Sequence, residues 1–209
     1  MIPPTAPTTP ARSTAVPRTQ YVFIDYENVC ESDLSRVIGK PAKVVMVIGS
    51  RHKNLPVSLF LFAQDHPGQL RIIQTPVQGR NALDFVLTLE LGRILAADPD
   101  GYFHIVSKDT DFESILRHLK DEKKLVARHK SLTEIPALRT PEERLAKLMA
   151  ELEDTDKSRP STRRKLENKI NSVFENKADP DFVGKAIASI IQSGILSFTD
   201  ADKISYKAA

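Results

Sequence analysis

The strongest constraint on the fold is a repeated pattern between residues 21 and 128, in which short apolar runs alternate with helix-length segments. Five runs are rich in β-branched and aromatic residues and apolar almost throughout, which is typical of strands buried on both faces. They lie at 21–24, 44–48, 70–73, 102–106 and 125–127, and the helical segments between them lie at about 32–39, 56–66, 81–97 and 111–121. The pattern predicts an α/β fold, a three-layer α/β/α sandwich around a parallel five-stranded sheet.

Composition and charge exclude several other classes of protein. The 209 residues are 41% hydrophobic and 27% charged, as in an average folded domain. The longest apolar runs are far shorter than the roughly 20 residues that span a bilayer, so we expect no membrane partner. The single cysteine, Cys30, excludes an intramolecular disulfide and a multi-cysteine metal site, and favours a reducing, cytoplasmic location. A net charge of +3 is too small to indicate nucleic-acid binding by itself.

The sequence divides into four parts. Residues 1–19 form a Pro/Thr-rich tail that we expect to be disordered, and residues 20–130 form the α/β domain. Residues 131–160 are expected to be a linker with one helix, which Thr140 caps and Pro141 begins. Residues 161–209 follow a helix–helix–hairpin pattern and predict a small winged-helix-like unit. Binding of nucleic acid, binding of another protein and homodimerisation all remain open for this unit.

Acidic residues follow two of the predicted strands. Asp25 comes after the first run, and Asp109 and Asp111 come after the fourth. In an open parallel sheet, ligands bind beyond the carboxyl ends of the strands, so these acids lie where a site is expected. Each also has a simpler interpretation. Acidic residues are favoured at the start of a helix, as Asp109 and Asp111 are, and many α/β sheets have an acid like Asp25 at the end of a strand.

A further carboxylate, Asp84, lies on an apolar helical stripe. Leu87, Leu91 and Leu95 follow it at three, seven and eleven residues, so all four share one face of the helix. We expect Glu90 and Arg93 to face solvent on the other side. Capping of the helix start, together with Asn81, is the alternative interpretation of Asp84. If all four acids meet, their mutual repulsion favours a hard divalent cation, Mg²⁺ or Mn²⁺.

Three motifs carry a resemblance to a known family. YVFIDYENV at 21–29, GRNALDF at 79–85 and HIVSKDTDF at 104–112 resemble the PIN-like nucleases, and are closest to the NYN branch. The resemblance covers about residues 21–128. It implies the strand order 3-2-1-4-5, which would place the first and fourth strands side by side, and metal-dependent hydrolysis of RNA phosphodiesters.

The resemblance also assigns roles to residues. Asp25, Asp84, Asp109 and Asp111 would be the catalytic metal ligands for Mg²⁺ or Mn²⁺, with Asn28 and Ser107 supporting them. Candidate contacts to the phosphates of the RNA substrate are Arg80, Arg51 and Lys53, whose other interpretation is plain exposure to solvent. We expect Glu27 to be a loop charge or a supporting group.

Two other functions compete with a nuclease. The first is a non-catalytic PIN-like scaffold that binds RNA or protein, which metal-dependent cleavage would distinguish. The second is a phosphatase or receiver-like domain on a similar sheet. A receiver would need a phosphoacceptor after the third run, where Thr75 and Pro76 stand, and a haloacid-dehalogenase phosphatase would need an aspartate at the position of Glu27. Both residues disfavour this second alternative.

Overall fold

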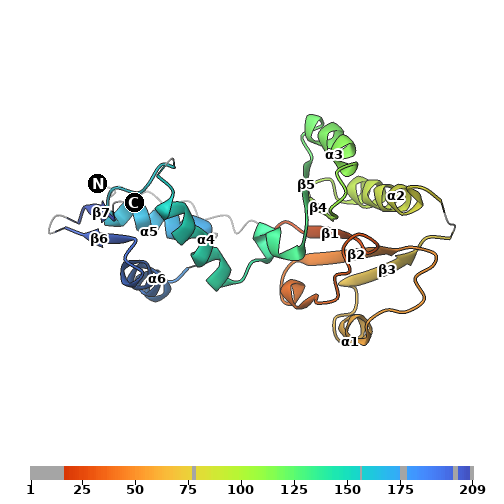
Figure 1. Ribbon diagram of the computed structural model, residues 1–209, viewed down its shortest axis with the longest axis horizontal. Coiled ribbons are helices and arrows are strands. Elements are labelled where there is room, and N and C mark those ends of the chain that lie inside the picture. Colours follow the sequence, from red (N-terminus) through yellow and green to blue (C-terminus); the bar gives the residue numbers. More distant parts are fainter. Residues whose placement is uncertain (1–16, 77–78, 156, 175–177, 200–201, 208–209) are drawn as a thin grey trace, which may run out of the picture. The chain divides into compact units, whose positions relative to one another are not determined.

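The computed structural model describes residues 17–76, 79–155, 157–174, 178–199 and 202–207. Residues 1–16 of the predicted disordered tail therefore lie outside the described part. The chain forms two compact units, the first ending at Ser131 and the second running from Leu132 to Ala209. Figure 1 labels the elements of both units.

The first unit is a parallel five-stranded sheet with helices on both faces, as the sequence predicts. The strand order is β3-β2-β1-β4-β5, so β1 lies between β2 and β4. In Figure 1, α2 and α3 lie on one side of the sheet and α1 on the other. The elements are β1 (Gln20–Asp25), η1 (Ser35–Val37), β2 (Ala42–Ile48), α1 (Val57–Asp65), β3 (Leu70–Gln74), α2 (Ala82–Ala97), β4 (Tyr102–Val106), α3 (Phe112–Asp121) and β5 (Leu125–His129).

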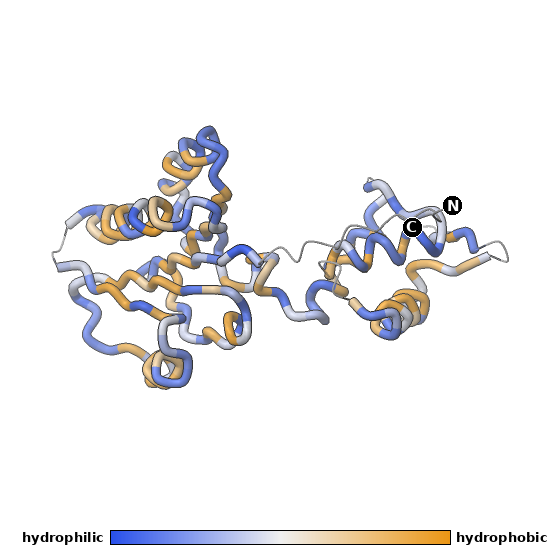
Figure 2. Tube along the Cα trace, turned by 180° about the vertical axis from the view of Figure 1, so that it is seen from behind, coloured by the Kyte–Doolittle hydropathy of each residue, from blue (hydrophilic) through white to orange (hydrophobic). Residues whose placement is uncertain are grey.

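The two covered faces explain why the central strands are apolar throughout. Side chains alternate between the faces of a strand, so Tyr21 and Phe23 of β1 pack in the core formed with α2 and α3. Val22 and Ile24, which point the opposite way, are fully buried as well. Figure 2 shows the resulting hydrophobic colour along the strands of the sheet. Gln20 and Asp25 of β1 lie at the ends of the strand, whereas His104 of β4 is a buried polar residue within one.

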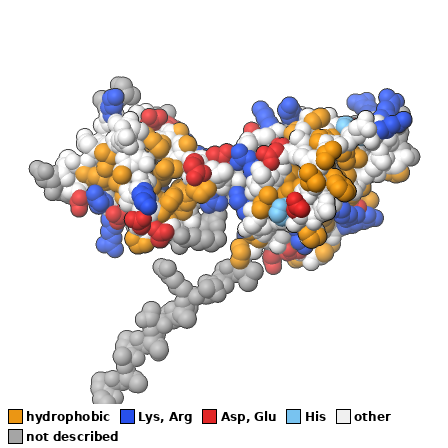
Figure 3. Space-filling model, turned by 90° about the horizontal axis from the view of Figure 1, so that it is seen from below, with side chains coloured by type: hydrophobic (Ala, Val, Ile, Leu, Met, Phe, Trp, Pro, Cys, Tyr) orange, Lys and Arg blue, Asp and Glu red, His pale blue; other side chains and the backbone are white. Residues whose placement is uncertain are grey.

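The helix α1 itself exposes part of its apolar surface. The segment predicted as a helix over about 32–39 contains only the short 3-10 helix η1, so that prediction is wrong in length. Along α1, Val57, Phe60 and Leu61 expose half or more of their side chains. Figure 3 views the molecule from the side of α1 and shows hydrophobic side chains on this surface.

The second unit has its own core. Its elements are η2 (Leu132–Glu134), η3 (Pro136–Leu138), α4 (Pro141–Glu153), α5 (Arg163–Val173), α6 (Pro180–Gln192), β6 (Leu196–Phe198) and β7 (Ile204–Tyr206). The predicted cap of α4 is confirmed, because Thr140 and Glu143 form a reciprocal capping box. Asp179 likewise caps α6, accepting a hydrogen bond from the backbone N–H of Phe182.

The predicted linker needs a correction. Leu148 and Leu152 of α4 are buried in the same core as Leu166 and Ile170 of α5. The helix therefore belongs to the second unit, because its apolar stripe packs there. β6 and β7 form an antiparallel pair after α5 and α6, and the winged-helix class of this unit stays a prediction. No helix in the described part of the chain combines the length and apolar character needed to cross a membrane.

Candidate metal site at the carboxyl ends of β1 and β4

The site begins where the two central strands end. β1 and β4 pair in parallel with Ile24 opposite Val106, so Asp25 and Ser107 come next on neighbouring strands. Ser107 Oγ donates a hydrogen bond to Asp25 Oδ2 at 2.8 Å, and the backbone N–H of Asn28 donates to Asp25 Oδ1 at 3.2 Å. Asp25 is 4% exposed, so a strand and two donors fix this carboxylate in a buried position.

Asn28 and Ser107 connect the loops that follow these strands. Ser107 Oγ accepts from the backbone N–H of Asp109 at 3.0 Å, in addition to donating to Asp25. The Asn28 side-chain oxygen accepts from the backbone N–H of Lys108 at 3.1 Å. The two side chains therefore hold the loop after β1 against the loop after β4, which is a supporting position.

Asp84 approaches the same place from the first turn of α2. The residue before this helix, Asn81, has a left-handed backbone with φ 59°, and its side chain makes no capping hydrogen bond. Asp25, Asp84 and Asp109 line one polar cavity of about 210 Å³. Glu27 and Asn28 also line it. The structure thus brings three of the four predicted ligands to one cavity.

The fourth acid, Asp111, lies at the edge of the site. It is exposed and is not among the residues that line the cavity. Its backbone N–H donates to Asp109 Oδ1 at 2.8 Å, so Asp109 supports the loop that leads into α3. Asp111 still acts on the cavity through its charge, because it helps to raise the pKa of Asp84.

The electrostatics of the cavity follow from burial and from like charges. Burial raises the pKa of Asp25, while the hydrogen bonds from Ser107 and Asn28 oppose that rise. The pKa of Asp84 is raised by burial first, and then by repulsion from Asp25, Asp109, Asp111 and Glu27. Negative charge therefore accumulates here at a cost that a bound cation would relieve.

The donor set fits a hard divalent cation in its chemistry. Carboxylate oxygens are the ligands that Mg²⁺ and Mn²⁺ prefer, and Asp25, Asp84 and Asp109 supply them from three separate elements. Among the described residues, no group of three or more acidic, histidine or cysteine side chains is already arranged closely enough to hold an ion. The three carboxylates line one cavity without forming a finished coordination shell.

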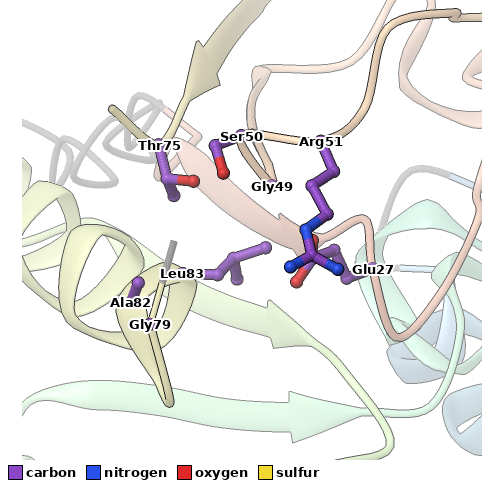
Figure 4. A pocket seen from close by; sticks show the side chains of 8 residues that line it. All are labelled: Glu27, Gly49, Ser50, Arg51, Thr75, Gly79, Ala82 and Leu83. Atoms are coloured by element: carbon purple, nitrogen blue, oxygen red, sulfur yellow. The ribbon is translucent and has the colours of Figure 1, made fainter. Parts of the chain in front are cut away.

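The predicted phosphate contacts differ in position. Arg51 lines a larger cavity of about 490 Å³ beside the acids, together with Glu27. Figure 4 shows its guanidinium group pointing toward the Glu27 carboxylate. Arg80 and Lys53 are exposed and line neither cavity. Of the three cations, Arg51 alone is placed in the wall of a cavity.

Sequence reasoning undervalued Glu27. This side chain lines both cavities, and its carboxylate packs directly on Gly49, where a Cβ atom would lie 1.6 Å from Glu27 Oε1. Gly49 therefore leaves the space that Glu27 occupies. The sequence gives only two signals for this contact. A glutamate stands two residues after a strand-end aspartate, and a glycine directly follows the next strand.

Glu90 was expected to face solvent, and the structure corrects that. It is 4% exposed and accepts hydrogen bonds from Arg71 at 2.8 Å and from Arg93 at 2.6 Å. The partner Arg71 lies on β3, so α2 covers Glu90 against the sheet while both guanidinium groups reach solvent. This ion-paired glutamate is structural and lies outside both cavities.

Comparison with known proteins identifies the first unit. Residues 19–129, slightly more than half of the chain, match the family model of the PIN domain. No curated protein and no solved structure matches the chain at a significant level.

Proposed function

Because this chain belongs to the PIN domain family, whose members are usually metal-dependent nucleases, we propose that it is a divalent-metal-dependent ribonuclease of the NYN type. The observation that carries the proposal is the meeting of Asp25, Asp84 and Asp109 in one cavity at the carboxyl ends of β1 and β4. Burial first, and then the charge of neighbouring carboxylates, raises the pKa of Asp25 and of Asp84, as expected where acids share one cavity.

In the proposed reaction, each acid has a task that follows from its position. A bound Mg²⁺ or Mn²⁺ would activate water and neutralise charge on the phosphodiester. Asp25 offers oxygens that Ser107 and Asn28 hold in place, so it would fix the ion. Asp84 and Asp109 would complete the protein ligands, and Asp111 would add negative charge from the rim.

The remaining assignments extend this proposal. Arg51 would face the polyanionic substrate, since its positive charge offsets the acids that line the adjoining cavity. Arg80 and Lys53 are exposed and would contact phosphates farther along the RNA. The second unit would bind nucleic acid, another protein or a second copy. The single cysteine and the lack of long apolar runs support a cytoplasmic setting.

Cleavage of labelled single-stranded RNA with Mg²⁺, Mn²⁺ or EDTA tests the proposal. Asp25→Asn and Asp109→Asn should each remove metal-dependent cleavage, while Asp100→Asn, an exposed acid outside both cavities, should cut at the wild-type rate. If wild type binds RNA but no metal supports cleavage, the protein is instead a PIN-domain scaffold. Cleavage at wild-type rates by the Asp25 and Asp109 variants would contradict the assigned site.

A further inference from the structure

The larger cavity adjoins the acid cavity and has different walls. Both share Glu27, Gly79, Ala82 and Leu83, so they form neighbouring compartments of one recess. The larger compartment, about 490 Å³, is completed by Gly49, Ser50, Arg51 and Thr75. One wall of this compartment therefore carries hydroxyl groups and a guanidinium group, and the other wall, at the start of α2, is apolar.

Thr75 is a buried polar side chain without an evident structural task. It directly follows β3, and its backbone N–H bonds to the carbonyl of Ile48 at 2.9 Å. The residue as a whole is 3% exposed, but its hydroxyl is open to the cavity, because no fully buried side-chain oxygen in the described part of the chain lacks a hydrogen-bond partner. Figure 4 shows this hydroxyl pointing into the cavity, toward Ser50. A hydroxyl that opens onto the cavity is available to a ligand.

The loop after β2, which carries Ser50 and Arg51 on the polar side of the cavity, is held in a fixed shape. The Gln74 side-chain amide donates toward three backbone carbonyls of the loop after β2, those of Gly49, Ser50 and His52, at 3.5, 3.3 and 2.9 Å. The His52 ring packs edge-on against Tyr26, with the centroids 5.1 Å apart. Gln74 thus fixes the backbone of the loop that carries Ser50 and Arg51, as expected of a largely preformed site.

We propose that this compartment binds the nucleoside adjacent to the scissile phosphodiester, an inference that rests on the proposed nuclease function. A nucleoside presents flat apolar faces and a polar edge. Ala82 and Leu83 supply the apolar wall, Thr75 and Ser50 offer hydroxyls to the polar edge, and Arg51 lies where a phosphate next to the acids would pass. Glu27, shared by both compartments, separates nucleoside from metal site.

Binding measured without metal tests the compartment separately from cleavage. The probe is a fluorescein-labelled, mixed-sequence, single-stranded RNA of eight nucleotides, titrated in EDTA at low salt. Thr75→Val keeps the side-chain shape and removes one hydrogen bond, so affinity should fall about three- to tenfold. Ser50→Ala should weaken binding in the same direction, and Ser58→Ala, at an exposed serine of α1 that lines neither cavity, should not.

The outcomes separate this inference from the proposed function. If RNA is cut, Thr75→Val should raise KM by a similar factor and leave kcat nearly unchanged, because the contact is the same in ground and transition states. If RNA is bound but never cut, weaker binding of the Thr75 and Ser50 variants still supports the compartment while the nuclease proposal fails. Wild-type affinity in both variants, or no RNA binding by the wild type, overturns the inference.

Discussion

At the scale of single residues, Asp25 and Asp84 of the acid cavity differ in the interactions that favour or oppose their charged forms. Asp25 is buried but receives hydrogen bonds from Ser107 and Asn28, which favour its charged form. Burial, and then repulsion from four neighbouring acids, opposes the charged form of Asp84 and raises its pKa. A substitution of Asp84 should therefore have two separable effects. It should relieve repulsion in the metal-free protein, and it should weaken metal binding.

We expect Asp84→Asn to hold or raise the melting temperature of the metal-free protein. The folded state raises the pKa of Asp84, so the ionised carboxylate costs stability at neutral pH, and the benefit of the amide should disappear as the pH falls toward the unfolded value. The rise in melting temperature on adding Mn²⁺ should shrink in the variant, because the ion loses an anionic ligand.

Thermal melts with EDTA and with excess Mn²⁺ measure both effects. Asp100→Asn is the matched control, since it removes one exposed carboxylate outside the cavity. An equal metal-induced rise in wild type and Asp84→Asn would show that Asp84 is not a ligand and only complements the α2 dipole.

A second residue-scale prediction concerns His104, which lies 1% exposed on β4 between Gln20 and His129. Burial, and then repulsion from His129, lowers its pKa to about 3. As the pH falls through about 6.5, His104 takes up a proton in the unfolded chain but not in the folded chain. The contribution of His104 to the free energy of unfolding therefore does not change with pH above about 6.5, and it should fall by about 1.4 kcal/mol per pH unit as the pH drops from there toward 3.

Urea unfolding at pH 7, 6 and 5 checks this dependence. His104→Asn removes the titrating ring, so its free energy of unfolding should fall less steeply with decreasing pH than that of the wild type. Parallel curves for the two proteins would mean that His104 is protonated in the folded state.

At the scale of elements, α1 offers neighbouring phenylalanines in opposite environments. Phe62 is 9% exposed and packs toward the sheet, whereas Phe60 is 69% exposed. Phe62→Ala should lower the free energy of unfolding by about 3–5 kcal/mol, and Phe60→Ala by less than about 0.5 kcal/mol. Chemical unfolding of both variants makes the comparison. A large loss for Phe60→Ala would show that its ring is covered in solution.

The elements also show what sequence reasoning can reach. The continuous apolar runs predicted the five strands because both sheet faces are covered, and the stripe beginning at Asp84 predicted the buried side of α2. Glu90 was misplaced because its partner Arg71 is 19 residues away on β3. Pairing across a helix and a strand depends on tertiary packing, which periodicity does not contain. The larger cavity was missed for the same reason, since its wall joins three separate loops.

At the scale of the whole molecule, the two units have separate cores. The PIN domain match ends at residue 129, close to the end of the first unit at Ser131. All acids of the cavity lie in that unit. A fragment ending at residue 131 should therefore keep whatever chemistry the cavity performs.

The boundary of the second unit gives the last prediction. A fragment of residues 132–209 should unfold cooperatively in urea, while one of residues 161–209 should be far less stable or unfolded. The shorter fragment lacks α4, whose Leu148 and Leu152 are 1% and 0% exposed in the core with α5 and α6. Losing even one buried leucine side chain costs about 2–5 kcal/mol, a large part of the stability of a domain this small.

Circular dichroism during urea titration measures the stability of both fragments. The double variant Leu148→Ala/Leu152→Ala in residues 132–209 tests whether these two side chains account for the difference between them. This variant should resemble the shorter fragment, because it removes the same contacts without removing the helix. Lys147→Ala on the exposed side of α4 is the matched control and should change little. If residues 161–209 are as stable as residues 132–209, α4 contributes nothing to the core, and the unit begins at residue 161 as its helix–helix–hairpin pattern first indicated.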